Sequence, residues 1–487
     1  MSGEELPEGW AISKLPEVFE INPPKPSLNA LAPEALVSFV PMPAVDAALG
    51  AIVDGFLRSF AEVRKGYTAF ADNDVILAKI TPCFENGKAA VARNLANGLG
   101  FGSSEFFVFR GMGAVLPDYL FHFIRQQRFR DDGAARMNGA VGQARIPSEF
   151  LRATDLPIPP LAEQRRIVEK VEALLEQVNR MKGRLERTSA ILKRFRQSVL
   201  AAACSGELTA EWRASNPAST SGTRPIISDD VMPEVPDSWG LVRFGSLVAS
   251  SFYGPRFSAD QYADDGIPTV RTTDMDFRGN ITVANSPKVQ LSPADISKYC
   301  LHDGDLLVTR TGATIGKCAV YSAPLGPALP SAYLIRFRLQ KTLVSPTFAL
   351  LYLQSPIGQT LLGTGQTSVA QPNVNARVIE GFPCPLPPLT EQHEIVRQVN
   401  RLFTLADTIE HRVNIAMARV EKLPQAILSK AFSGELVPTE AELARLEGRT
   451  YETAEALLAR VRNEAGTTNT ATKPARKRRG AKKTGGD

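Results

Sequence analysis

The sequence contains few of the residues that bind metal ions or form covalent cross-links. Only 5 cysteines occur among 487 residues, and no two of them have the CxxC spacing. Cysteines that are scattered and odd in number are typical of free thiols in a reducing cytoplasm, so a zinc site is not expected. The 4 histidines are isolated along the chain, and no metal cluster or catalytic triad can be built from them by spacing.

The chain also has no long apolar run. Its most apolar stretch, residues 35–53, contains Pro41, Pro43 and Asp46, which make it too broken to span a membrane. The N-terminal MSGEELPEGW has neither the basic start nor the apolar core of a secretory signal. We therefore expect a cytoplasmic protein that has no membrane partner.

Positive charge is concentrated at one end of the sequence. From Lys473 to Asp487 there are seven Lys and Arg and one Asp, so this segment carries +6, whereas the whole chain carries +5. The rest of the protein is therefore about −1, and any DNA binding by it must use local basic patches. We expect residues 467–487 to form a basic disordered tail, which either contacts phosphates non-specifically or is only solvated.

Two short motifs approach known catalytic or nucleotide-binding sequences and then depart from them. Asn22-Pro23-Pro24 is followed by Lys25, where DNA amino-methyltransferases carry an aromatic residue that stacks on the flipped base. Residues 312–317 have three residues between their glycines where a phosphate loop has four, and Cys318 replaces its Mg²⁺-binding Ser or Thr. We interpret the first as a turn and the second as a hairpin loop, and expect neither catalytic nor metal-binding residues in this chain.

What the sequence does contain is one long segment that occurs twice. PIPPLAEQ and the residues after it, from Pro157 to Leu208, correspond to PLPPLTEQ and the residues after it, from Pro385 to Leu436. The two copies stay in one register, because 391 minus 163 for the Glu of each copy and 434 minus 206 for the Gly both give 228. A repeat this long is a duplicated half-protein rather than a solenoid.

Each copy is predicted to form one long helix. Pro160 and Pro388 lie just before the expected starts, and Gly206 and Gly434 lie where a C-terminal glycine cap belongs. Between them apolar residues recur at alternating intervals of four and three, which predicts a supercoiled helix pair of roughly 60 Å; the alternative for either copy alone is an ordinary core-packing helix. The residues expected to pack along the helices are Ile167, Val171, Leu174, Val178 and Leu185 in the first copy and Ile395, Val399, Leu402, Ile409 and Val413 in the second.

Two residues should disturb these helices. Pro424 is expected to kink the second copy near its end, and Gly183 is expected to loosen the first.

A globular unit precedes each copy, and the two units share a plan but little side-chain identity. DVILAKITPCFENGK in the first and DLLVTRTGATIGK in the second each predict a strand, a loop ending in Gly-Lys, and a second strand. In each unit a further strand and a helical stretch follow, and both units begin with a tryptophan behind a turn, which we expect to anchor the core. The strands are expected at residues 105–110 and 332–338, the helical stretches at 117–130 and 346–362, and the tryptophans are Trp10 and Trp239.

This plan predicts an α+β protein in which two α/β domains are separated by two long antiparallel coiled-coil helices, duplicated about a pseudo-twofold axis. The expected segments are the first domain at 6–155, the first long helix at 156–208, a linker at 209–234, the second domain at 235–383, the second long helix at 384–437, a C-terminal helical segment at 438–466 that docks or caps, and the tail.

The ordered set of motifs, present twice over residues 6–437, resembles the specificity (S) subunit of type I DNA restriction-modification systems. The residues that carry the resemblance are the paired PPLxEQ-to-SGEL segments, Asp74–Lys88, Asp305–Lys317, Gly266–Asp274 and Gln371–Val374. The resemblance implies that the globular units are target recognition domains for double-stranded DNA. It implies two methyltransferase (modification) subunits held on the helices, and restriction/translocase subunits in the full complex. It further implies a non-catalytic chain without a cofactor, with S-adenosylmethionine, ATP and magnesium on the partner subunits.

Loop residues with suitable donors are the candidates for DNA contact; for each, the alternative is a solvated surface charge or a turn residue. They are Lys79, Asn86 and Lys88 in the first unit and Arg256, Arg271, Arg310 and Lys317 in the second. Because Gly-Lys recurs in both units, we hypothesise that the repeated lysines position phosphates, while the loops that differ specify bases.

The sequence thus predicts a DNA-recognition subunit whose two domains each read one half of a bipartite, asymmetric site. An antiparallel helix pair would hold the two recognition domains about one to two DNA turns apart. The length of the DNA spacer between the half-sites should therefore depend on the length of the helices. The alternatives are a stand-alone DNA-modifying enzyme and a coiled-coil scaffold that binds only protein.

Overall fold

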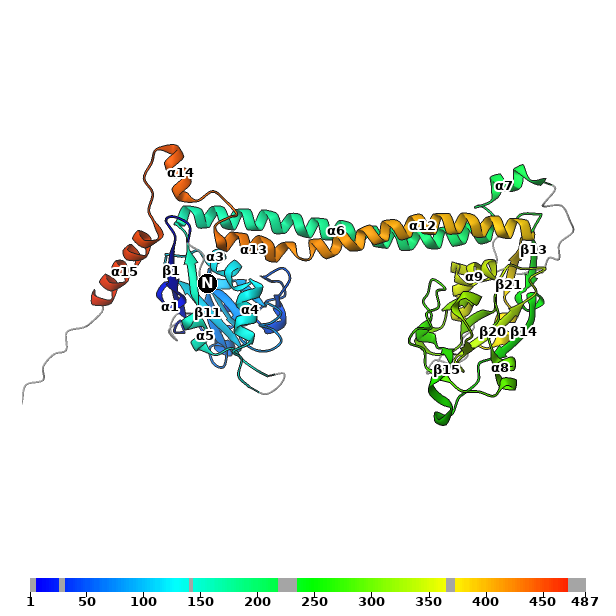
Figure 1. Cartoon of the computed structure of the whole chain (residues 1–487). Helices are drawn as coiled ribbons and strands as arrows, with labels where there is room; N and C mark the ends of the chain where they lie inside the picture. Colours follow the sequence, from blue (N-terminus) through cyan, green and yellow to red (C-terminus); the bar gives the residue numbers. More distant parts are fainter. Residues whose placement is uncertain (1–5, 26–30, 140–142, 218–233, 365–372, 472–487) are drawn as a thin grey trace, which may run out of the picture. The chain divides into compact units, whose positions relative to one another are not determined.

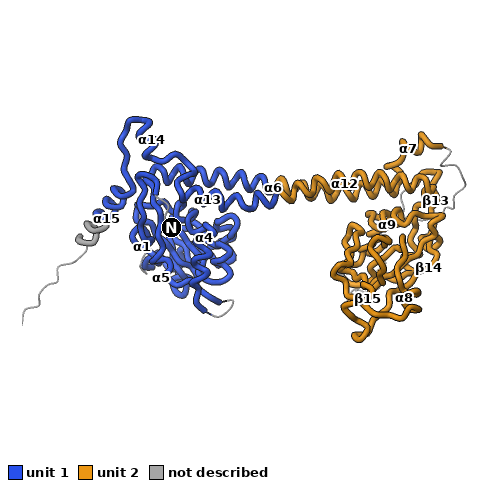
Figure 2. The backbone as a smooth tube through the Cα atoms, viewed as in Figure 1, with its two compact units in different colours: residues 1–183, 417–487 blue, residues 184–416 orange. Residues whose placement is uncertain are grey.

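A computed structural model describes residues 6–25, 31–139, 143–217, 234–364 and 373–471. The chain forms two compact units (Figure 2): unit 1 comprises Met1–Gly183 and Met417–Asp487, and unit 2 comprises Arg184–Ala416. Unit 1 is therefore assembled from both ends of the sequence, and unit 2 from one continuous segment. Figure 1 shows the elements coloured along the chain.

Unit 1 is built on a four-stranded antiparallel sheet with the order β2-β11-β8-β9. These strands are Phe19–Ile21, Phe106–Gly111, Val75–Ala78 and Ala89–Val91. All four residues of β8 are buried, since Val75 and Leu77 point into one apolar cluster and Ile76 and Ala78 into another. A strand covered on both faces is a continuous apolar run, as the sequence VILA is. The predicted strand–loop–strand is confirmed.

A second sheet with the order β6-β3-β10-β7 adjoins the first, and its β3 and β10 are parallel. Its strands are Phe56–Ser59, Leu36–Val40, Leu99–Gly102 and Thr68–Ala71. The pair β4 and β5 (Val45–Asp46, Ala51–Ile52) and the short helices α1, α2 and α5 (Leu15–Val18, Phe60–Val63, Ser148–Ala153) complete this part of unit 1.

Unit 2 repeats the plan with the antiparallel sheet β14-β20-β17-β18. These strands are Val248–Tyr253, Leu334–Leu339, Leu306–Thr309 and Cys318–Val320. Here too the central strand is buried on both faces, with Leu306 and Val308 in one cluster and Leu307 in another. The accompanying sheet differs from that of unit 1, because it has three strands in the order β16-β15-β19. They are Lys288–Val289, Tyr262–Val270 and Leu329–Pro330, and the short helices α8 and α11 are Pro293–Tyr299 and Ala376–Glu380.

Each expected helical stretch is in fact two helices. In unit 1, α3 (Pro117–Ile124) is separated from α4 (Gln127–Ala134) by Arg125 and Gln126, and the helical path breaks at Gln126, where ψ is 138°. In unit 2, α9 (Pro346–Gln354) ends where Ser355 becomes extended, and α10 (Pro356–Thr364) begins at a proline. A residue before proline is disfavoured in helical geometry, which accounts for the second break.

The long helices begin where the sequence predicts. α6 (Leu161–Ser205) runs without a break through Gly183, whereas the second copy is divided into α12 (Leu389–Val420) and α13 (Leu423–Ser433). The division precedes Pro424, since proline lacks an amide proton and its ring clashes with the carbonyl four residues earlier. The expected kink is therefore confirmed. The helix is continuous through Gly183, so this glycine does not interrupt it.

The apolar residues expected to pack along the helices differ in burial. Ile167, Val171, Val178, Ile395, Val399 and Val413 are buried, and Leu174, Leu185 and Leu402 are half-buried. Ile409 is instead 37% exposed, because a pair of helices covers such a residue from one side only. The helix ends are the best buried, where they join the core of each unit.

The segments after the helices differ from the sequence expectation. The expected linker contains the helix α7 (Ala210–Ser215), which packs near the start of α12 through Arg213. The expected C-terminal helical segment forms two helices, α14 (Glu440–Glu447) and α15 (Ala454–Ala471), the second extending past residue 466. Residues 454–461 of α15 contribute four side chains to the main core of unit 1, so this segment is a cap. The rest of the expected tail, 472–487, lies outside the described residues.

No helix that the structure describes has both the length and the apolar character needed to cross a lipid bilayer.

His122 in α3 should make unit 1 sensitive to acid. The ring is 4% exposed, neither nitrogen has a hydrogen-bond partner, and burial lowers its pKa to about 4. The unfolded state therefore takes up a proton at a pH where the folded state does not, so stability falls as the pH drops from about 6.5 to 4, by up to about 3 kcal/mol. Urea unfolding at pH 7 and pH 5 should show a smaller loss in His122→Phe than in the natural protein. His302→Phe, at an exposed position of unit 2, is the control; equal losses in all three proteins would contradict the expectation.

Candidate nucleic-acid interface

One edge of each main sheet collects most of the candidate DNA-contact residues. In unit 1, β8 ends at Ala78 beside the first residues of β9 and β11, since these neighbours are antiparallel. The loop after β8, which contains Lys79, Asn86 and Lys88, therefore lies at that edge. In unit 2 the ends of β14 and β17 meet the starts of β18 and β20 in the same way. We call these two places, formed by the loops that follow β8 and β17 and by their neighbours, the loop edges.

The candidates in unit 2 surround its loop edge. Arg310 directly follows β17, Lys317 directly precedes β18, and Arg256 follows β14. Arg256 is exposed and makes no hydrogen bond or ion pair with another described residue. Arg271 is partly engaged, because its guanidinium donates to Asp274 at 2.8 and 3.0 Å and closes the short turn that follows β15.

The two repeated lysines make equivalent contacts inside their own units. Lys88 Nζ donates to the carbonyl of Met42 at 3.0 Å, and Lys317 Nζ donates to the carbonyl of Thr272 at 3.1 Å. Both acceptors belong to a 3-10 turn on the neighbouring sheet, so each lysine ties the hairpin loop to that turn. An ammonium group has three protons, so this bond leaves two for another partner. The phosphate-positioning role remains a prediction.

Exposed aromatic side chains lie beside the cations of the unit 2 loop edge. The Arg310 guanidinium lies 4.6 Å from the ring centre of Tyr253, and Lys317 Nζ lies 5.4 Å from that of Phe277. Tyr253 and Phe277 are 39% and 59% exposed, and Tyr333, whose carbonyl accepts from the Arg310 amide, is 57% exposed. Exposed rings beside guanidinium groups can stack on bases. Sequence reasoning missed these aromatic residues, because only the pairing of the strands reveals which aromatic side chains face solvent and which lie in the core.

In unit 1 the cations are placed differently. Lys79 Nζ lies 5.5 Å from the ring centre of the buried Phe107, and the side chain of Asn86 is exposed. The guanidinium of Arg145 donates to both oxygens of Glu105 at 2.9 Å, and this hydrogen bonding lowers the pKa of that carboxyl group. Arg145, which sequence reasoning also missed, stands at the loop edge through a backbone bridge to Ile80.

The same bridge in unit 2 carries other side chains. Asn373, which follows Arg145 by the 228-residue interval of the repeat, bridges to Thr311 and accepts from Arg310 Nε at 3.4 Å. The backbone of the loop edge is thus repeated, since the Lys79 amide donates to the Glu105 carbonyl as the Arg310 amide donates to that of Tyr333. The side chains differ: Arg145 is replaced by Asn373, and Glu105 by Tyr333. The two edges consequently present different hydrogen-bonding groups on a similar frame.

At the other end of each sheet, the paired Glu-Gln motif joins the globular part to its long helix. Trp10 Nε1 donates to Glu163 at 2.8 Å in unit 1, and Trp239 Nε1 donates to Glu391 at 2.9 Å in unit 2. Glu163 also accepts from the backbone amide of Glu440 at 2.8 Å. Glu391 also accepts from the Thr209 hydroxyl at 2.7 Å and from Arg213 Nε at 3.0 Å. Burial nevertheless raises the pKa of Glu163 above its usual value. The tryptophans are thus polar as well as apolar anchors.

The glutamine of each motif completes the junction. Gln164 accepts from the Leu116 amide and donates to the carbonyls of Ala114 and Pro159. Gln392 does the same in unit 2, with the Ser345 amide and the carbonyls of Leu343 and Pro387. Both motifs are 0% exposed, so every polar group here depends on its partner. Among the described residues, no three His, Cys, Asp or Glu side chains gather as a group that could hold a metal ion.

Two segments of the chain, residues 7–187 and 236–417, match the family model described as type I restriction modification DNA specificity domain. The chain belongs to this family. It is 28% identical to the EcoEI specificity subunit of Escherichia coli, over 88% of this chain and 83% of that one. It is 33% identical to the EcoKI specificity subunit of Escherichia coli K12, over 68% of each chain. The relatives in this family are specificity subunits of type I restriction enzymes.

Solved structures share the fold of these specificity domains. A chain from a study of the assembly and conformational transition of the type I R-M system matches with a TM-score of 0.70 at 23% identity, over 89% of this chain and all of that one. The HsdS subunit from Thermoanaerobacter tengcongensis matches with a TM-score of 0.58 at 22% identity, over 89% and 99% of the two chains. The α+β architecture of two domains with two long helices is therefore the family fold.

The buried Glu391 should be worth several kcal/mol to unit 2. Replacing it with Ala would remove the acceptor of the Trp239 indole, the Thr209 hydroxyl and Arg213 Nε, at a cost of about 3–5 kcal/mol. Glu391→Gln keeps an acceptor oxygen and should cost less. Glu394→Ala, one turn further along α12, removes an ion pair with the 64% exposed Arg397 and should cost under about 1 kcal/mol. Urea unfolding of the full chain would test this order; equal losses for Glu391→Ala and Glu394→Ala would refute it.

Proposed function

We propose that this chain is the DNA-recognition subunit of a type I restriction-modification complex. Each recognition domain, the globular part of one unit, reads one half of a bipartite, asymmetric site. The observation that carries this proposal is the loop edge, which is built twice on one backbone frame and carries different side chains at positions 145 and 373. A repeated frame with different hydrogen-bonding groups is what two readers of different sequences require.

The loop edges hold the two kinds of group that duplex recognition needs. Lys88 and Lys317 occupy equivalent positions, so they suit contacts that both half-sites have in common, which are the phosphates. Asn373 in unit 2 takes the place of Arg145 in unit 1, and it bonds to Arg310 where Arg145 bonds to Glu105. These planar groups suit base edges. Arg256, Arg271, Lys79 and Asn86 extend the same surfaces. We thus assign phosphate contacts to the positions that carry the same residue in both units, and base reading to the positions that differ.

The chain would act through partners. We propose that it is non-catalytic, that its long helices dock two methyltransferase subunits and set the spacer, and that restriction/translocase subunits join them. S-adenosylmethionine, ATP and magnesium would then bind to those partners. Several outward side chains of the helices, Ile191, Leu405 and Ile415 among them, are more than 40% exposed, which is compatible with docking along the helices.

The proposed function is tested by mapping methylated adenines in the host genome with and without this gene. Deletion should abolish methylation of one split, non-palindromic motif, and the motif itself would give the two half-sites and the spacer. An unchanged map, together with failure of the co-purified complex to bind any duplex, would overturn the proposal.

Lys88→Ala should weaken DNA binding without changing the target. If Lys88 contacts a phosphate, the complex should lose affinity for all duplexes alike, and the slope of log affinity against log salt should fall by about 1. Lys14→Ala is a matched control, since Lys14 pairs with Asp155 in the antiparallel pair of β1 (Ala11–Lys14) and β12 (Asp155–Ile158) beside the helix start. A change in the preferred bases with an unchanged salt slope would instead assign Lys88 to base reading or to loop structure.

A further inference from the structure

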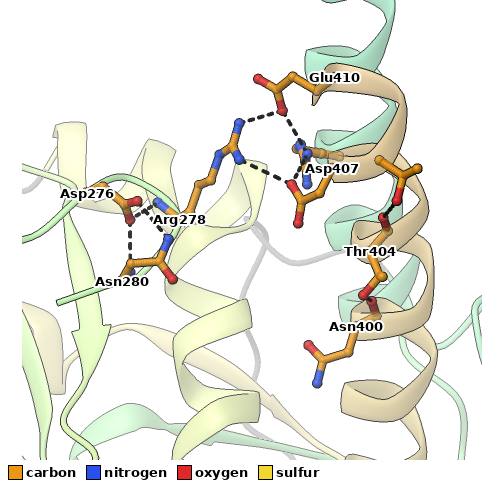
Figure 3. A network of polar contacts seen from close by, with 9 residues as sticks. Asp276, Arg278, Asn280, Asn400, Thr404, Asp407 and Glu410 are labelled. Carbon is orange, nitrogen blue, oxygen red and sulfur yellow. Dashed lines mark hydrogen bonds and ion pairs between the residues drawn. The ribbon is translucent and has the colours of Figure 1, made fainter. Parts of the chain in front are cut away.

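Two carboxylates on α12 are each shared by two arginines from different elements (Figure 3). Asp407 and Glu410 lie one turn apart on the same face of the helix. Arg196 of α6 donates to them at 2.6 and 3.0 Å, and Arg278, from the loop of residues 276–280, donates at 3.1 and 2.6 Å. All four residues belong to unit 2. The result is a neutral network of two cations and two anions that joins the second recognition domain to both long helices.

The loop that carries Arg278 is held in shape by its own hydrogen bonds. The Asp276 carboxylate accepts from the amides of Arg278 and Asn280 at 2.8 and 2.9 Å and from the Asn280 side chain at 2.7 Å. Gly279 has φ at +87°, and a Cβ there would come within 2.9 Å of the Leu350 side chain. Because only glycine fits this turn easily, the loop presents Arg278 to the helix in one conformation.

Arg278 provides a second attachment, well separated from the first. The domain is already fixed at the start of α12 by the junction around Glu391 and Gln392. Asp407 lies 16 residues further along, about 24 Å at 1.5 Å per residue. A body held at one end of a rod can tilt about that point, whereas a body held at two separated points cannot.

The same loop also contacts the loop edge. Phe277, directly before Arg278, lies under Lys317 Nζ, and Lys317 in turn donates to Thr272. A short run of residues therefore connects the surface proposed to meet DNA with the face of α12. Any tilt that breaks the Arg278 contacts would displace this surface along the duplex.

We propose that Arg278 is a positioning residue that fixes the tilt of the second recognition domain on the long helices and thereby restricts the spacer that the complex accepts. This inference rests on the proposed function. It applies to the second domain, because the positions 228 residues before Asp407 and Glu410 are Asn179 and Lys182, which offer no pair of carboxylates. In unit 1 a different part of the domain contacts the helix, since Gln425 of α13 accepts from the backbone amide of Gln127, the first residue of α4, at 2.7 Å.

The network should respond to salt. The side chains of Arg278 and Asp407 are 50% and 53% exposed, so dissolved ions screen their attraction. Spacer selectivity should therefore decline as the ionic strength rises in the natural complex.

The test measures methylation by the purified complex on a duplex set that keeps both half-sites and varies the spacer by single base pairs. The complex with Arg278→Ala should methylate duplexes whose spacer is one base pair shorter or longer than the preferred one about fivefold better, relative to the preferred spacer, than the natural complex does. The bases recognised in each half-site should not change. Arg278→Lys should give a profile between the two, because it keeps the positive charge but loses the fixed fork in which Nη1 bonds Asp407 and Nη2 bonds Glu410. High salt should broaden the range of spacers that the natural complex methylates, toward the range of the Arg278→Ala complex, and should change the range of that variant little.

Lys341→Ala is the matched control. It removes one positive charge and one exposed ion pair, with Asp303, from the same domain without affecting α12, and should keep the natural spacer profile. An unchanged profile in Arg278→Ala, altered half-site bases, or loss of methylation at every spacer would each overturn the inference. Lack of methylation by the natural complex on any duplex would count against the proposed function instead.

Discussion

The structure depends on one buried carboxylate at the start of each long helix. Glu163 and Glu391 are fully buried, and each is surrounded by donors from segments far apart in the sequence. A carboxylate in an apolar interior is tolerated only when its oxygens are paired, so the domain, the helix and the segment after the partner helix must assemble together. The neighbouring glutamine then fixes the angle between domain and helix.

This junction allows the rest of each domain to differ. The sheet beside the junction, with the ion pairs Arg110–Asp74 and Arg338–Asp305, is nearly the same in both units. The opposite, loop edge keeps the equivalent lysines Lys88 and Lys317 but differs at positions 145 and 373, and the accompanying sheets differ in strand number and order. A rigid end and a variable end on one frame separate the task of assembly from the task of recognition.

Sequence reasoning recovered what is periodic or repeated. The heptads, the terminal glycines, Pro424 and the strand–loop–strand motifs all have local causes, and the elements formed where expected. The Glu-Gln pair was noticed as a repeated motif, but its role depends on Trp10 or Trp239, about 150 residues earlier, which no local pattern reveals. The exposed rings of Tyr253 and Phe277 were missed for the same reason, since strand pairing decides which aromatics face solvent. Helix α7 was missed because it is only 6 residues long, too short for an apolar periodicity, and its contact with Glu391 through Arg213 is not visible in the local sequence.

The composition of unit 1 has a consequence for how the chain is made. Its main core includes Leu428 and Phe432 from α13 and Leu457 and Val461 from α15, which a ribosome would synthesise last. Unit 2 is continuous in sequence and can complete its core during translation, whereas the N-terminal part of unit 1 must wait with an apolar surface uncovered. The first domain to be synthesised is therefore the last to be finished, and truncation of the chain should harm the domain most distant from the cut in sequence.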